Sequence, residues 1–188
     1  MSIQEIIERI KATLNYTFSE IDQWFDRPDT LRTFQPPTGS WSIDEVLEHI
    51  SLTNHYLLIL IAKGRDKALT LAPVSNLEDA LQDYHFDREE LEEVGVHASF
   101  DWIRPEHMEP TGEKKPEYIR ELLRAQLKQC LDILAVLPNG EGILGTTTMS
   151  VNNLGKLDVY QYIYFLALHA KRHLTQMEQV ERKFEQLT

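Results

Sequence analysis

Two histidines near the C-terminal end of the sequence have the spacing needed to bind one metal ion. His169 and His173 are four residues apart, and residues four apart lie on the same face of an α-helix, one turn from each other. Two imidazoles placed in this way can each direct a nitrogen at one point, as a metal ion requires of ligands from a single helix. Two ligands do not complete a site, so a third donor must come from another part of the chain.

The segment that carries this pair is predicted to be a long helix, from residue 158 to about residue 185. Uncharged residues recur along it at intervals of three or four, which is the spacing of one helical face. This face consists of Tyr162, Phe165, Leu166, His169, His173, Met177 and Val180. Both histidines are therefore expected to point toward the core.

His49 is the candidate for the third ligand, because it lies on the apolar face of another predicted helix. His55 lies six residues further along that helix, about 240° around its axis, and so points elsewhere. His85, His97 and His107 fall in a segment without clear periodicity. Three imidazoles that leave coordination positions vacant are typical of a reactive rather than a structural metal site.

These histidines also have a simpler interpretation. A histidine on an apolar helix face can be a core residue whose ring hydrogen-bonds a backbone carbonyl. A pair with a spacing of four can also arise by chance. Spacing alone does not decide between a metal site and a buried polar cluster.

Apolar periodicity predicts three more helices, at residues 3–25, from residue 42 to about 64, and at 116–137. Ser42 and Glu45 form a capping-box pattern at the start of the second helix, and capping is also the simplest role for Glu45. Two short helices, 76–84 and 86–94, are expected in the long connection between the second and third helices. The β-branched run 146–151 could be extended, but it is too isolated to support a sheet.

These elements predict one domain over residues 1–188, with an all-α fold. Its architecture is expected to be a four-helix bundle with a long crossover between helices 2 and 3.

Composition and charge narrow the function. The net charge of -11 and the lack of a basic patch argue against binding to nucleic acid. The longest apolar run, 57–62, is far shorter than the ~18 residues of a membrane-spanning helix, so no membrane association is expected. Cys130 is the single cysteine and lies on the apolar face of the third helix, which indicates a buried, unreactive thiol. Together with the lack of a signal-peptide pattern, this favours a reducing, cytoplasmic location.

Two stretches resemble motifs of the DinB-like (YfiT-related) metalloenzyme superfamily. The first is the run WSIDEVLEH at residues 41–49. The second combines Gly155 with residues 164–177, where two histidines, an arginine and a glutamine fall into place together. The resemblance extends over the four predicted helices in order, and hence over most of the chain, whereas the crossover matches only through a proline-rich stretch before the third helix.

The resemblance implies that His49, His169 and His173 bind a divalent metal ion, with nickel and zinc as the leading candidates. It also implies a homodimer, for which Leu58, Ile59 and Ile61 could supply an apolar patch outside the four core-facing stripes. Characterised relatives are transferases and isomerases that use low-molecular-weight thiols such as bacillithiol or mycothiol, while many members have no known reaction.

The leading hypothesis is a metal-dependent enzyme in which a small thiol (S-transferase type) or water (hydrolase type) attacks a small electrophile. The ion would lower the pKa of that thiol or water. The alternative is a non-catalytic, stress-associated homodimeric bundle whose metal ion has no reaction to support.

Three other residues are considered for the pocket. Tyr162 and Gln176 lie about two turns to either side of His169 on nearly the same face, so they are candidates for its lining. Core packing of Tyr162 and a hydrogen bond from Gln176 to a neighbouring group are the simpler interpretations. Arg172 could contact an anionic group of a substrate, but the default interpretation is an exposed surface arginine.

Overall fold

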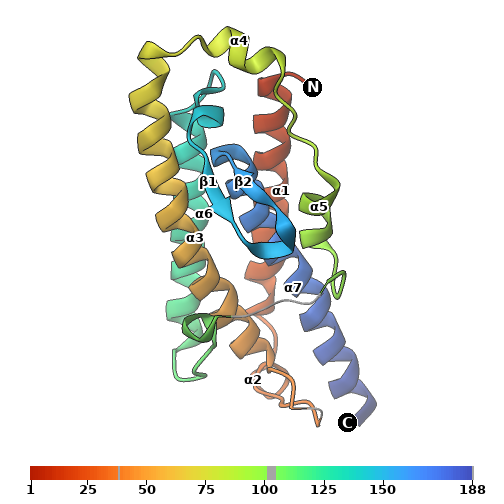
Figure 1. Cartoon of the computed structure of the whole chain (residues 1–188). Coiled ribbons are helices and arrows are strands. Elements are labelled where there is room, and N and C mark those ends of the chain that lie inside the picture. Colours follow the sequence, from red (N-terminus) through yellow and green to blue (C-terminus); the bar gives the residue numbers. More distant parts are fainter. Residues whose placement is uncertain (38, 101–104, 188) are drawn as a thin grey trace.

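The framework of the protein consists of long helices that run side by side (Figure 1). The structure is a computed structural model that describes residues 1–37, 39–100 and 105–187. Within these residues four helices are at least 20 residues long: α1 (Ile3–Trp24), α3 (Ile43–Leu71), α6 (Pro116–Ala135) and α7 (Val159–Leu187). They correspond to the four expected helices, and the all-α class is confirmed.

The long helices enclose one apolar core. α7 packs against α1 and α3, and α6 packs against the opposite sides of the same two helices. Each presents one apolar stripe inward, such as Ile6, Ile10 and Leu14 of α1. The first half of α7 differs, because every residue from Val159 to Ala170 is buried. A helix that is buried on all sides must be covered by further elements.

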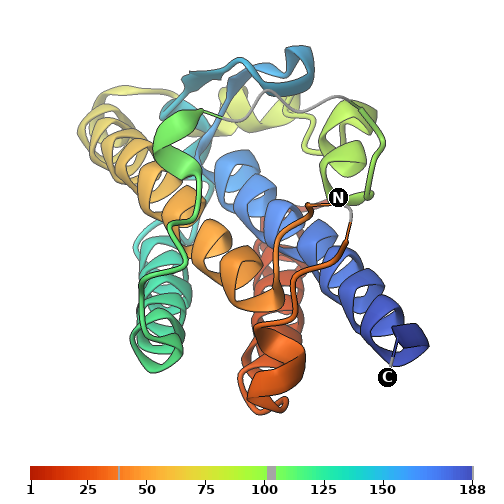
Figure 2. The ribbon, with the colours of Figure 1, turned by 90° about the horizontal axis from the view of Figure 1, so that it is seen from below.

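The crossover provides part of this cover. It contains the 3₁₀ turns η1 (Ala72–Val74), η2 (Glu93–Gly95) and η3 (Glu106–Met108) and the short helices α4 (Leu77–Gln82) and α5 (Glu89–Glu92). α4 and α5 match the two short helices that were expected there, although both are shorter. Figure 2 shows α4, α5 and the β-hairpin on the side of the molecule away from α6.

One crossover contact connects three elements. Arg9 of α1 binds Glu92 at 2.6 Å and the hydroxyl of Tyr164 at 3.1 Å, and thereby holds α5 against α7.

The second long helix extends beyond its predicted end near Gly64. Gly64 lies inside α3, at a point where the backbone of Gly145 approaches closely. A Cβ atom at Gly145 would lie 2.1 Å from the carbonyl oxygen of Gly64, far inside any allowed contact. Gly64 therefore permits close packing within a helix rather than ending it, and α3 continues to Leu71.

A β-hairpin contradicts the expectation that residues 146–151 are too isolated to form a sheet. Strands β1 (Thr147–Met149) and β2 (Gly155–Leu157) are antiparallel, with Thr147 opposite Leu157. The turn η5 (Val151–Asn153) places Asn152 at φ 46° and Asn153 at φ 53°, a left-handed conformation that asparagine tolerates better than most residues. The Asn152-Asn153 sequence thus reverses the chain between the two strands.

Two further short elements complete the fold. α2 (Asp29–Arg32) is a single helical turn in the loop between α1 and α3, and η4 (Glu141–Leu144) follows α6. No helix in the described part of the chain is long and apolar enough to cross a membrane.

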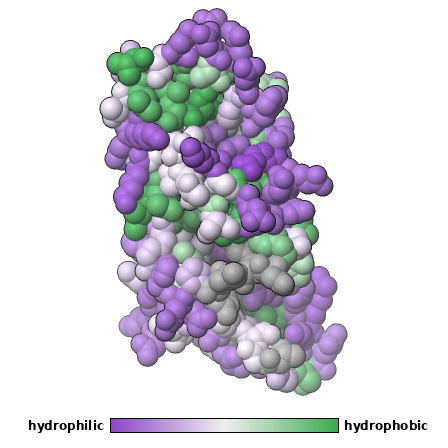
Figure 3. Space-filling model, viewed as in Figure 1, coloured by the Kyte–Doolittle hydropathy of each residue, from purple (hydrophilic) through white to green (hydrophobic). Residues whose placement is uncertain are grey.

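Two of the three residues expected to form an exposed apolar patch do not lie on the surface. Leu58 and Ile61 are buried in the core, and only Ile59 is exposed, at 42%. The apolar patch predicted from these three residues is therefore wrong, because α3 is covered on more sides than its stripe suggested. The face in Figure 3 is mainly polar, with apolar side chains gathered near its upper end.

Candidate metal centre

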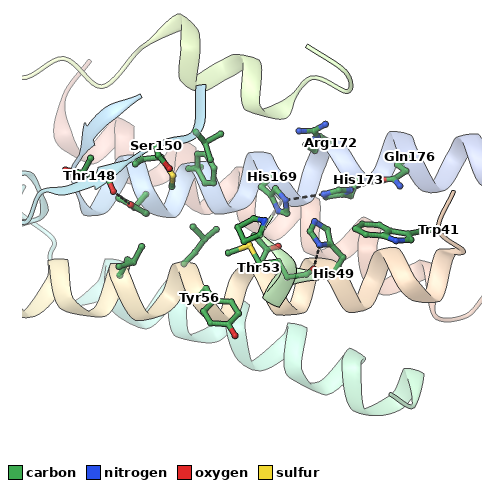
Figure 4. Close-up of a pocket in the computed structure, with 18 residues that line it drawn as sticks. Trp41, His49, Thr53, Tyr56, Thr148, Ser150, His169, Arg172, His173 and Gln176 are labelled. Atoms are coloured by element: carbon green, nitrogen blue, oxygen red, sulfur yellow. Dashed lines mark hydrogen bonds between the residues drawn. The ribbon is translucent and has the colours of Figure 1, made fainter. Parts of the chain in front are cut away.

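The structure brings His49 of α3 together with His169 and His173 of α7, where the two helices face each other (Figure 4). One nitrogen from each ring lies within 4.8 Å of those of the other two. The Nε2 atoms of His169 and His173 are 3.2 Å apart. All three residues are buried, with 5%, 2% and 7% of their surface exposed.

The hydrogen bonds of two histidines fix which ring nitrogen carries the proton. Nδ1 of His49 donates to the carbonyl oxygen of Met108 at 2.7 Å. Nδ1 of His173 donates to Oε1 of Gln176 at 2.8 Å. Both acceptors are carbonyl oxygens, which can only accept, so the Nε2 atom of each neutral ring retains its lone pair. Metal-binding histidines in proteins are usually oriented in this way.

The separation of the nitrogens suits a metal ion. Two imidazole nitrogens bound to one zinc-sized ion at tetrahedral angles lie about 3.3 Å apart, given metal–nitrogen distances of about 2.0–2.1 Å. The observed 3.2 Å between His169 and His173 is close to this value. The two imidazoles of α7 are therefore already placed for a metal ion, and His49, whose nitrogen lies within 4.8 Å of theirs, could complete a set of three imidazoles.

The electrostatic environment keeps the two rings of α7 neutral. Burial lowers the pKa of His169 well below its usual value, and repulsion from His173 and His49 lowers it further. Burial and the proximity of His49 likewise lower the pKa of His173 to about 3. Neutral imidazoles are the form that binds metal, so the pair does not have to lose protons at neutral pH.

Glu48, which sequence reasoning missed, holds the loop that contacts His49. Its buried carboxylate accepts hydrogen bonds from the backbone N–H of Thr111 at 3.1 Å and of Gly112 at 2.8 Å. It also accepts from Oγ1 of Thr111 at 3.1 Å and pairs with Lys114 at 3.3 Å. No periodic pattern marked Glu48, because its partners come from the crossover.

A cavity of about 550 Å³ adjoins the three histidines. It lies between α3 and α7 and beneath the β-hairpin. Its lining comprises Trp41, His49, Thr53, Tyr56, Leu57, Leu60, Pro105, Met108, Thr148, Met149, Ser150, Val151, Tyr162, Phe165, His169, Arg172, His173 and Gln176. Both Tyr162 and Gln176 are among these residues. Tyr162 also donates from its hydroxyl to the carbonyl oxygen of Thr148 at 3.1 Å.

The interpretation of Arg172 as an exposed surface residue is wrong. Only 9% of it is exposed and it lines the cavity, because the crossover covers the outer side of α7. Burial lowers the pKa of its guanidinium to about 10.

Cys130 is buried as predicted. Burial raises the pKa of its thiol to about 12, so it is no nucleophile. His97, which the sequence gave no reason to connect with the site, lies near enough to His173 to contribute to lowering its pKa.

Comparison with known proteins identifies the family of the chain. The chain is 28% identical over 158 residues to the uncharacterized protein YuaE of Bacillus subtilis (strain 168), covering 80% of this chain and 83% of that protein. No solved structure matches the chain significantly. The family model described as the DinB superfamily matches residues 7–177, which include all three clustered histidines, and on this evidence the chain belongs to the DinB superfamily.

Proposed function

We propose that the protein is a divalent-metal-dependent enzyme that joins a small thiol to a small electrophile. In this proposal His49, His169 and His173 hold the ion, and the adjoining cavity holds the electrophile. The observation that carries the proposal is the convergence of three buried imidazoles beside an open cavity, two of them with their proton on the nitrogen that faces away. A structural metal site would instead be closed by a fourth protein ligand.

The ion would lower the pKa of a thiol or water molecule bound to it, which supplies a nucleophile near neutral pH. Three neutral histidines leave its positive charge undiminished. Nickel and zinc both accept imidazole ligands, and they are the ions we propose.

The composition of the cavity favours a thiol over water. None of the described lining residues is an aspartate, glutamate, lysine or cysteine, so this part of the chain offers the cavity neither a carboxylate base nor a nucleophile of its own. Glu48 is next to His49 in the sequence, but its carboxylate oxygens accept hydrogen bonds from Thr111 and Gly112 and do not line the cavity. A thiol starts from a pKa of about 8.5 and water from about 15.7, so the same ion would ionise a bound thiol more completely than a bound water, and a water that stayed neutral would need a base within hydrogen-bond reach. Hydrolysis is therefore the second candidate.

An activity screen tests this proposal. The purified protein is assayed with bacillithiol, mycothiol and glutathione against a fluorogenic alkyl halide, with and without a chelator and after adding back nickel or zinc. We expect thiol consumption that the chelator abolishes and one of the ions restores. Metal bound stoichiometrically without turnover of any thiol or of ester substrates would instead support the non-catalytic homodimeric bundle.

A further inference from the structure

We propose that the substrate is an elongated molecule with a small polar head at the three histidines and an uncharged hydrocarbon or aromatic tail along the cavity. This inference rests on the proposed function and names the class of its electrophile. It follows from the length of the cavity, the chemistry of its far part and the distribution of charge around it.

The cavity is long enough for a head and a tail. Along α3 its lining extends from His49 to Leu60, which are eleven residues apart, or about 16 Å at the rise of an α-helix. Figure 4 shows His49, His173 and Gln176 toward one end and Thr148 and Ser150 toward the other. The volume of about 550 Å³ lies within the usual range for small-molecule sites.

The part of the cavity away from the histidines is mostly apolar, with Thr148 and Ser150 as its polar residues. Leu57 and Leu60 line it from α3, Met149 from β1, and Tyr162 and Phe165 from α7. The hydroxyl of Tyr162 is already bonded to a backbone carbonyl of β1, so the residue offers its ring rather than its polar atom. A bound group that fills this part gains by burying apolar surface and finds few polar partners.

Charge also points to an uncharged tail. The chain has 30 acidic residues, yet none of the described residues that line the cavity is acidic. Arg172 is the only permanently charged side chain among them, and Figure 4 shows it on the side of α7 away from His49. A charged group beside Leu57 and Leu60 would lose its hydration without gaining a partner there.

A series of straight-chain hydroxamates from two to ten carbons tests this arrangement by binding alone. The hydroxamate group chelates the ion, and the alkyl chain extends into the cavity. With nickel- or zinc-loaded protein and calorimetric titration, each added methylene should strengthen binding about threefold to fourfold until the chain reaches the end of the cavity.

Two neighbouring substitutions provide the comparison. Leu60→Glu places a carboxylate in the far part of the cavity and should weaken the eight-carbon hydroxamate at least tenfold, leaving acetohydroxamate unchanged. Ile59→Glu changes the adjacent exposed residue and should leave both affinities unchanged. Retained binding of acetohydroxamate, together with an unaltered helical circular dichroism spectrum, shows that Leu60→Glu has folded.

A second series separates the two proposals from each other. Straight-chain alcohols lack the chelating head, so in metal-free protein they probe only the apolar part of the cavity. Longer alcohols should raise the Tm of the metal-free unsubstituted protein but not that of metal-free Leu60→Glu. Suppose that the affinity of no hydroxamate depends on metal, while the rise in Tm caused by the alcohols still depends on chain length. This result would refute the metal site and support the apolar part of the cavity. If neither the affinity of the hydroxamates nor the Tm with the alcohols changes with chain length, the proposed apolar tail of the substrate is wrong.

Discussion

The carbonyl oxygen of Met108 lies 2.7 Å from Nδ1 of His49, although the two residues are 59 positions apart in the sequence. The bond fixes the ring so that Nε2 faces His169 and His173. Met108 belongs to a loop that the carboxylate of Glu48 holds by Thr111 and Gly112. The residue before His49 thus controls the orientation of His49 through the crossover rather than by direct contact.

Replacing this carboxylate should weaken metal binding. In Glu48→Gln the remaining oxygen can still accept from the N–H groups of Thr111 and Gly112, but the NH₂ group that replaces the other oxygen can neither accept from the hydroxyl of Thr111 nor pair with Lys114, so the loop and Met108 are held less firmly. We expect the metal Kd to rise about tenfold or more, measured by competition with a chromophoric chelator. Asp66→Asn, on the exposed side of the same helix, is the control and should bind metal as the native protein does. An unchanged Kd in Glu48→Gln would show that the loop does not orient His49.

Removing a histidine from the cluster should abolish stoichiometric metal. His173→Ala leaves two imidazoles from different helices, and we expect the metal content, measured by elemental analysis after gel filtration, to fall from about one ion per chain to a small fraction. His55→Ala is the matched control, because His55 is an exposed histidine on α3. Full retention of metal in His173→Ala would refute the proposed ligand set.

Acid should destabilise the metal-free fold through the buried histidines. The pKa of His173 is lowered to about 3 in the folded protein, against about 6.5 in the unfolded chain. The unfolded state therefore binds more protons between these values, and stability is full above about pH 6.5 and is lost as pH falls toward 3. His169 acts in the same direction. Urea denaturation in the presence of a chelator, at several pH values, measures how steeply the free energy of unfolding changes with pH.

Asp158 complicates this measurement, because burial raises the pKa of its carboxyl to about 6. The folded state then binds more protons than the unfolded state between about pH 6 and the ordinary aspartate pKa of ~3.9, so this group adds stability as pH falls through that range. Comparison with His173→Gln isolates the histidine contribution. The slope between pH 6.5 and 4 should be shallower in the variant. Identical slopes would show that His173 does not titrate as a buried group.

The close approach of Gly145 to Gly64 should make substitution costly. In Gly145→Ala the new methyl group would lie 2.1 Å from a backbone oxygen, so α3 or η4 must move, and we expect a loss of about 3 kcal/mol in the free energy of unfolding. Gly95→Ala is a useful comparison, because its methyl group would meet the flexible end of Leu168 at 3.0 Å. Chemical denaturation should give the smaller loss for Gly95→Ala. Equal losses would mean that the α3 contact tolerates a side chain.

Features that follow from local periodicity were predictable from the sequence. The long helices and the inward direction of His49, His169 and His173 all follow from apolar residues repeated every three or four positions. Features set by distant partners were not. Arg172 is buried on a helix that elements of the crossover also cover. The hairpin depends on left-handed backbone at Asn152 and Asn153, and the extension of α3 past Gly64 depends on the approach of Gly145.

The placement of the three histidines on only two helices has a consequence for the lifetime of the folded protein. His49 and His169 are 120 positions apart (169 minus 49), so an ion shared between them would act as a reversible cross-link that closes a very long loop. Such a link restricts the unfolded chain as a disulfide does, and its effect increases with loop length. It would also keep α7 from separating from α3 until the ion departs. The rate of metal release, rather than the strength of the apolar core, would then limit the rate of unfolding.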